Sequence, residues 1–175
     1  DDETCAYYSY ASTVSFAGTA GATYYIFWDP YWNGVDIFDF EISLAPVILP
    51  PPNDPFCTPT AIVVDAPPIT DDNTGATAEA WEPSGSCHFG GDLAQTTLWY
   101  SFVAPSSGKA KISTDFTGGT LTDTQLALFS WDEVEPCTGP TLLELGCDDD
   151  GGTGLLSIIN AIDLVVGNTY YIQLD

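Results

Sequence analysis

Turn-forming residues divide this chain into short segments of alternating apolar and polar side chains, and this alternation limits the possible folds most strongly. A two-residue period places one set of side chains on each face of a β-strand. Thr, Val, Ile, Tyr and Phe, which favour strands, are plentiful, whereas Lys and Arg together number 2 and Met is absent. We therefore predict an all-β fold of antiparallel β-sandwich or jelly-roll-like modules in tandem. The expected strands are residues 13–16, 23–28, 38–44, 97–103, 108–114, 124–130, 155–162 and 169–174.

An internal repeat relates the first part of the chain to the last part. Residues 21–29 (GATYYIFWD) and 167–175 (GNTYYIQLD) are identical at six of nine positions, with an offset of 167 − 21 = 146 residues. At this offset Asp2 falls on Asp148, so an acidic cluster precedes the shared motif in both copies. We expect residues 1–29 to repeat the part of a module that residues 147–175 represent.

A proline-rich segment separates the two copies. Residues 46–55 (PVILPPPNDP) contain five prolines, which favour an extended and semi-rigid spacer. We place a linker at residues 47–53, with the module boundary at about residues 50–53. Residues 1–46 are expected to be the C-terminal part of one β-sandwich module, and residues 54–175 most of the next module without its last strands.

The charge balance excludes two classes of partner. The chain has 25 acidic residues and 2 basic ones, Lys109 and Lys111, for a formal net charge of -23. Binding to the phosphates of nucleic acid or to an anionic membrane surface needs several basic side chains on one face. We therefore expect binding neither to nucleic acid nor to an anionic membrane surface. Because no stretch approaches about 18 uninterrupted apolar residues, we also expect no membrane insertion. A 45% hydrophobic composition supplies material for a packed core.

Five cysteines indicate an oxidising compartment. They form no C-x-x-C pair, so neither a zinc site nor a thiol redox motif is indicated. Disulfides are the better interpretation, with Cys137 paired to Cys147 across a hairpin-sized loop and Cys57 paired to Cys87. Cys5 is left over, and we expect its partner to precede Asp1. The chain is therefore predicted to be extracellular, either secreted or attached to the cell surface.

The order of the motifs in the second part of the chain resembles a known family. The motifs are NDPFCTPTAIVV (53–64), GDLAQTTLWYSFVAPSSGKAKIST (91–114), TDTQLALFSWDE (122–133), CTGPTLLELGCDDDGG (137–152) and VGNTYYIQLD (166–175). Together they resemble the PPC-like (bacterial pre-peptidase C-terminal) β-sandwich modules of secreted and surface proteins of Bacteroidetes. The resemblance covers residues 53–175, and residues 1–46 look like the tail of a preceding copy. It implies a non-catalytic repeat or appendage of an exported protease, adhesin or large surface protein.

Two acidic clusters are candidate metal sites. Calcium takes about six to eight oxygen ligands, and consecutive carboxylates followed by glycines supply several. Asp148, Asp149 and Asp150 precede two glycines, and Asp123 in a neighbouring turn adds a further ligand. The equivalent cluster in the first copy is Asp1, Asp2 and Glu3. We predict calcium at these clusters; the alternative is a solvated acidic loop.

Exposed aromatic residues allow two interpretations. Trp28, Tyr31 and Trp32 lie in and beside a turn that also carries polar side chains, as carbohydrate-binding sites do. The same rings would serve equally well in a contact between modules. The first interpretation predicts glycan binding that is lost in Trp32→Ala, and the second predicts that Trp32 is buried against a neighbouring module.

No catalytic constellation is apparent, so we expect no enzymatic activity. His88 is the sole conventional general base, and its neighbour Cys87 points to the opposite face of an extended segment. The leading hypothesis is a structural repeat of an extracellular fibre or large cell-surface adhesin, with partners that are copies of itself or neighbouring modules. These modules are either tandem in one chain or joined by strand exchange between subunits. The alternative is a carbohydrate- or substrate-binding accessory domain of a secreted hydrolase.

Overall fold

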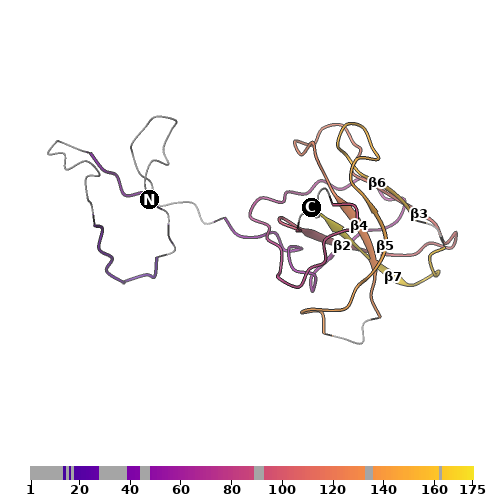
Figure 1. Cartoon of the computed structure of the whole chain (residues 1–175), viewed down its shortest axis with the longest axis horizontal. Coiled ribbons are helices and arrows are strands. Elements are labelled where there is room, and N and C mark those ends of the chain that lie inside the picture. Colours follow the sequence, from indigo (N-terminus) through magenta and orange to yellow (C-terminus); the bar gives the residue numbers. More distant parts are fainter. Residues whose placement is uncertain are drawn as a thin grey trace. The chain divides into compact units, whose positions relative to one another are not determined.

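The chain divides into two compact units, residues 1–47 and residues 48–175, which we describe separately. The structure is a computed structural model of residues 1–175, shown as a cartoon in Figure 1. It describes residues 14, 16, 18–27, 39–43, 48–88, 93–132, 136–161 and 163–175.

The second unit is built from two β-sheets, which confirms the predicted all-β class. The larger sheet has five strands in the order β1-β2-β7-β4-β5, and the smaller sheet pairs β3 with β6. All neighbours are antiparallel except β1, which runs parallel to β2. The strands are β1 (Thr60–Ala61), β2 (Leu98–Val103), β3 (Ala110–Ser113), β4 (Leu126–Ser130), β5 (Leu143–Asp148), β6 (Ile158–Ala161) and β7 (Thr169–Leu174).

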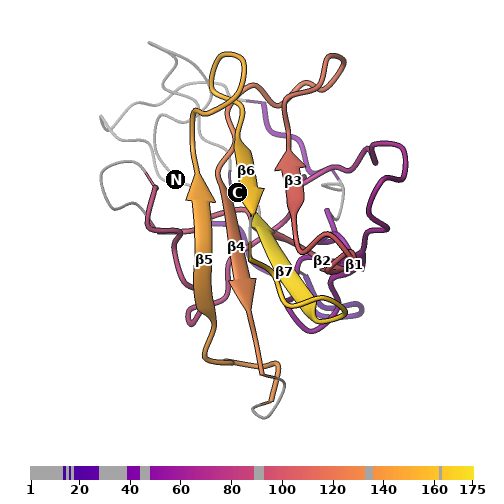
Figure 2. The same cartoon turned by 90° about the vertical axis from the view of Figure 1, so that its right-hand side faces the viewer.

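The small sheet covers one face of the large sheet, as Figure 2 shows with β3 and β6 in front. The side chains between the two sheets form the main core. Leu98, Tyr100 and Phe102 of β2 contribute one row, and Leu128 of β4 and Ile172 of β7 continue it across the sheet. Because side chains alternate along each strand, the residues between these ones point to the opposite face.

That opposite face is also buried, under loops instead of a second sheet. Trp99, Phe129 and Tyr171 project from β2, β4 and β7 and surround Phe56, whose ring centroid lies 4.9 Å from those of Trp99 and Tyr171. Trp81 closes the cluster from a loop, 5.8 Å from Phe56 between centroids. Burial on both faces explains why the central strands are almost continuously apolar in sequence.

The sequence predictions for the second unit hold for most strands. The predicted segments 97–103, 108–114, 124–130, 155–162 and 169–174 each contain one observed strand, β2, β3, β4, β6 and β7 respectively. Strand β5 was not among the predicted strands, because its segment was assigned to a short disulfide loop. It pairs along β4 with a bulge between Leu128 and Phe129.

Part of the predicted linker belongs to the second unit, whose first residue is Ile48. Asn53 is buried, and its carbonyl accepts a hydrogen bond from the Trp99 amide at 2.8 Å. The adjacent Asp54 is also buried and accepts hydrogen bonds from Thr77. The end of the proline-rich segment is therefore anchored to β2.

The first unit shows no strand over its described residues, so the strands predicted at 23–28 and 38–44 are wrong for residues 23–27 and 39–43. The physical reason is that no described segment pairs with their backbone, and a strand exists only as part of a ladder. Of the predicted strand 13–16, only Val14 and Phe16 are described, and neither is in a strand. In the described part of the chain there is no helix long and apolar enough to cross a membrane.

Candidate metal site and its disulfide frame

Two segments that are distant in sequence lie side by side at the start of β4. Asp123 forms an isolated β-bridge with Leu155, and the Thr124 amide donates a hydrogen bond to the Leu155 carbonyl at 2.9 Å. Asp123 directly precedes the segment that becomes β4, whereas Leu155 lies in the loop that connects β5 to β6. This pairing brings Asp123 next to the acidic residues that follow β5.

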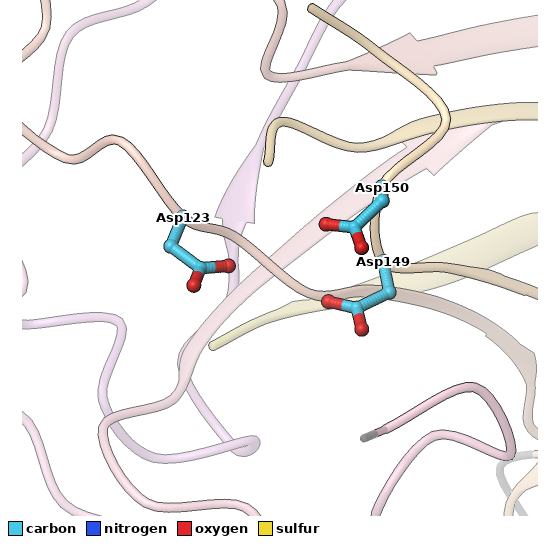
Figure 3. A group of neighbouring side chains, drawn as sticks. All are labelled: Asp123, Asp149 and Asp150. Atoms are coloured by element: carbon cyan, nitrogen blue, oxygen red, sulfur yellow. The ribbon is translucent and has the colours of Figure 1, made fainter. Parts of the chain in front are cut away.

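Three carboxylates converge where these segments meet. Asp123, Asp149 and Asp150, here named the acidic triad, each offer one ligand oxygen, and these oxygens lie within 4.8 Å of one another. Figure 3 shows Asp149 and Asp150 on one segment with their carboxylates directed toward the segment of Asp123. The structure thus brings together three of the four acidic residues proposed as ligands in this unit.

The fourth, Asp148, holds the loop in place. Its Oδ2 accepts hydrogen bonds from the Gly151 amide at 2.9 Å and from the Ile158 amide at 2.6 Å. A Cβ on Gly151 would lie 2.5 Å from this carboxylate, so a larger residue there would force the Asp148 side chain to move. Asp148 therefore ties the end of β5 to the start of β6 and leaves the neighbouring carboxylates to point outward.

A buried hydroxyl network supports the same loop from below. Ser157 and Thr124 are both buried, and the Ser157 amide donates to the Thr124 hydroxyl at 3.1 Å and to the Thr114 hydroxyl at 2.9 Å. The Ser157 hydroxyl lies 2.8 Å from the carbonyl oxygen of Asp149. The backbone of the triad is thus fixed to β3 and β4 as well as to β5. Sequence reasoning missed this network, because isolated Ser and Thr residues carry no spacing signal.

The surroundings of Asp150 disfavour its charged form. Desolvation, and then the negative charges of Asp149, Asp123 and Asp148, raise the pKa of Asp150 above its ordinary value. No described residue donates a hydrogen bond to the carboxylate of any member of the acidic triad. Such a set of oxygens suits a hard divalent cation, which would supply the missing positive charge.

The other sequence-predicted site residues cannot be placed. Asp1, Asp2 and Glu3 of the first acidic cluster lie outside the described residues, as do the aromatic candidates Trp28, Tyr31 and Trp32. Calcium at the first cluster, and glycan binding or packing at the aromatic residues, remain predictions.

The disulfide pairing predicted from the sequence is wrong. Cys57 pairs with Cys137, with a Cα–Cα distance of 5.2 Å, and Cys87 pairs with Cys147, with a Cα–Cα distance of 5.6 Å. The predicted pairs were Cys57 with Cys87 and Cys137 with Cys147. The reason is β5: Cys147 lies opposite Ala127 near the end of this strand, whereas Cys137 precedes the strand at its other end.

Both disulfides staple loops to the second buried face of the large sheet. Cys137 and Cys147 both pack against the cluster of Phe56, Trp99 and Tyr171. Cys147 immediately precedes the acidic loop, so its bond to Cys87 fixes the strand end from which the loop departs. Next to Cys87 in the sequence, the Ser86 amide donates a hydrogen bond to the Glu144 carboxylate at 2.9 Å. The metal candidate is therefore built on a covalently restrained strand.

A second group of acidic residues lies at the edge of this face. Glu82 accepts hydrogen bonds from the Thr97 hydroxyl at 2.6 Å and from the Trp99 indole at 3.0 Å. Burial, followed by a hydrogen bond with Glu82 and its charge, raises the pKa of Glu79 to about 8. The raised pKa of Glu79 favours its neutral form near neutral pH.

Comparisons with protein-family models, curated proteins and solved structures found no match for this chain.

Proposed function

We propose that this chain is a non-catalytic structural repeat of an extracellular fibre or large cell-surface adhesin, stapled by disulfides and stabilised by calcium. The observation that carries the proposal is the acidic triad on a restrained loop. The loop is fixed by Asp148, by the Ser157 network and by the Cys87–Cys147 bond, so the carboxylates are held together before any cation binds. A cation there would join the start of β4 to the loop between β5 and β6.

The extracellular setting rests on the disulfides. The structure has two disulfides. Disulfides persist in oxidising compartments and are rare in the cytosol. The resemblance of the motif order to PPC-like modules of Bacteroidetes surface proteins points in the same direction. We infer that the module acts as a spacer or assembly unit, with copies of itself or neighbouring modules as partners.

Thermal unfolding with and without calcium tests the metal. Extracellular calcium modules bind with dissociation constants of roughly 0.1–1 mM. At 10 mM calcium, mass action then stabilises the folded state by about 1.4–2.7 kcal/mol, which raises the melting temperature by roughly 5–10 °C. Asp123→Asn should abolish this shift. Asp65→Asn, which removes the same charge from an exposed position, should retain it. A melting temperature that does not respond to calcium or EDTA in the wild-type chain refutes the calcium proposal.

Electron microscopy of the native material with and without EDTA tests the structural role. Filaments with an axial repeat of one module are expected, and EDTA should loosen them if the acidic triad holds calcium. Isolated particles of uniform size would contradict the fibre. In that case, binding to a glycan array that disappears in Trp32→Ala would favour the accessory-domain alternative.

A further inference from the structure

The 146-residue sequence repeat has a counterpart in the backbone. Gly21 has a φ of 79° and Gly167 a φ of 84°, both in the left-handed region that glycine tolerates best. The Ala22 amide donates to the Thr19 carbonyl at 3.1 Å, and the Asn168 amide donates to the Val165 carbonyl at 3.1 Å. These two hydrogen bonds join residues at equivalent positions, so the same turn forms in both units.

A tyrosine hydroxyl closes each turn in the same way. In the second unit the Val165 amide donates to the Tyr170 hydroxyl at 2.8 Å. In the first unit the Thr19 amide donates to the Tyr24 hydroxyl at 2.7 Å. Both bonds span five residues, and both partners are displaced by 146 positions. The shared sequence alone does not imply this hydrogen bond between an amide and a tyrosine hydroxyl. Its presence in both units identifies residues 18–27 as the structural counterpart of residues 164–173.

In the second unit this segment leads into a central strand. β7 lies between β2 and β4: Tyr171 is opposite Ser101 on one side and Phe129 on the other. Its side chains are also buried on both faces, with Tyr171 6% exposed on one face and Ile172 4% exposed on the other. Residues 23–26 have the same sequence as residues 169–172 of β7 and follow a turn with the same hydrogen bonds, so the first segment has the composition of a strand that pairs on both edges.

The first unit does not supply those neighbours among its described residues. Tyr25, the counterpart of Tyr171, is 94% exposed, and Phe27, the counterpart of Gln173, is 88% exposed. Tyr24 and Ile26 are also exposed. Within the described residues, the strands β2 and β4 already flank β7. An apolar segment of this kind, with no backbone pairing of residues 23–27 among the described residues, is a candidate for strand addition.

We propose that residues 21–27 form a β7-type strand that inserts between a β2-type strand and a β4-type strand of another module of this fold. The partner is thus a second β-sandwich whose β7 position is open, and the contact is a shared sheet. This strand insertion rests on the proposed modular function, because it identifies the surface by which one module binds the next. The turn that precedes the strand is already set by Gly21 and Tyr24, so insertion requires only that the strand edges be paired.

The proposal can be tested in the full chain by a substitution that removes β7 from its place between β2 and β4. Tyr171→Pro removes an amide from the centre of β7 and prevents that strand from pairing on both sides. We expect residues 21–27 of the same chain or of a second copy to take its place. Hydrogen exchange of amides 23–27 should then slow by at least roughly 100-fold, while residues 169–174 become unprotected. Sedimentation distinguishes insertion within one chain, which leaves a monomer, from exchange between two copies, which gives a dimer.

Two further variants make the result decisive. Tyr25→Pro combined with Tyr171→Pro disables both strands and should leave the second unit unfolded. Phe27→Gln combined with Tyr171→Pro makes residues 23–27 identical to residues 169–173, so a misfit of the Phe27 ring cannot prevent insertion. Amides 23–27 that remain unprotected in this variant, together with a second unit as unfolded as in the double proline variant, would overturn the proposal. The calcium response of the wild-type chain is measured separately, so failure of the strand-insertion proposal can be distinguished from failure of the calcium proposal.

Discussion

Replacing cysteines two at a time separates the observed disulfide pairing from the one that sequence spacing suggested. The bonds close segments of 80 residues (Cys57–Cys137) and 60 residues (Cys87–Cys147). In the chain-entropy model, losing them costs about 4.5 and about 4.3 kcal/mol respectively, because the cost depends only on the logarithm of loop length. A Cys137–Cys147 bond would have closed a short loop worth roughly 3 kcal/mol.

The informative variant is Cys57→Ala/Cys87→Ala. With the observed pairing it breaks both disulfides and costs about 9 kcal/mol, which exceeds the stability of many domains of this size and should leave the second unit unfolded. Cys57→Ala/Cys137→Ala is the matched control, because it removes the same number of sulfur atoms but breaks one bond. It should remain folded, with the free energy of unfolding lowered by about 4.5 kcal/mol.

Urea unfolding followed by tryptophan emission measures these losses, since Trp99 is fully buried in the native state. All variants are best compared in a Cys5→Ala background, so that no free thiol exchanges with the remaining disulfide. Peptide mapping under non-reducing conditions, after cleavage at acidic residues, provides a direct check, because Glu144 lies between Cys137 and Cys147. The reasoning is refuted if Cys57→Ala/Cys87→Ala loses only one bond and Cys57→Ala/Cys137→Ala loses both.

Three other predictions concern the second unit. The stability that Glu79 contributes is fully present below its unfolded pKa of about 4.5 and is lost as pH rises through about 8, where the carboxyl ionises beside Glu82; urea midpoints from pH 4 to 9 should fall over this window, and Glu79→Gln should flatten the fall. Phe129→Ala empties a buried site in the cluster that contains Trp99 and Tyr171 and should cost about 3–5 kcal/mol in urea unfolding, whereas the exposed Val103→Ala should cost far less. Tyr170→Phe removes the hydroxyl that accepts from the Val165 amide and should cost about 1 kcal/mol, with faster hydrogen exchange at Val165; unchanged exchange there would contradict this role.

Short apolar runs between turn residues were sufficient to predict the central strands. The segments of β2, β4 and β7 are rich in apolar and aromatic residues, and this composition acts within a few positions. The observed strands are mainly shorter at their ends than the predicted ones. Strand β5 was not predicted, because the cysteines around its segment indicated a disulfide loop; it is an edge strand on which Leu143 and Leu145 are exposed.

The disulfides could not be predicted by proximity in sequence. Cys137 and Cys147 are ten positions apart, but Cys147 lies near the end of the six-residue strand β5, whose extended backbone separates it from Cys137. Which cysteines meet is decided by how loops fold over the second face of the large sheet, and no local pattern records that. The role of Asp148 could not be predicted either, because the residues that follow it are also aspartates. Its hydrogen bonds to the Gly151 and Ile158 amides depend on the geometry of the loop.

The acidic composition of this chain is accommodated by backbone amides instead of by basic side chains. With 25 acidic residues against 2 basic ones, ion pairs are not available in number. Asp175 accepts hydrogen bonds from the Gln95 and Thr96 amides at 2.9 and 2.7 Å, and Asp148 accepts two amides as described above.

A carboxylate held by backbone donors keeps its charge at little cost, and it fixes a loop more firmly than a mobile surface ion pair would. The acidic triad differs from these residues, because its carboxylates face one another and the described residues give them no donors. Asp148 and Asp175 have backbone donors and the triad has none among the described residues, so the proposed calcium would supply the charge that is missing there. This is why the calcium response of Asp123→Asn is the most informative test of the site.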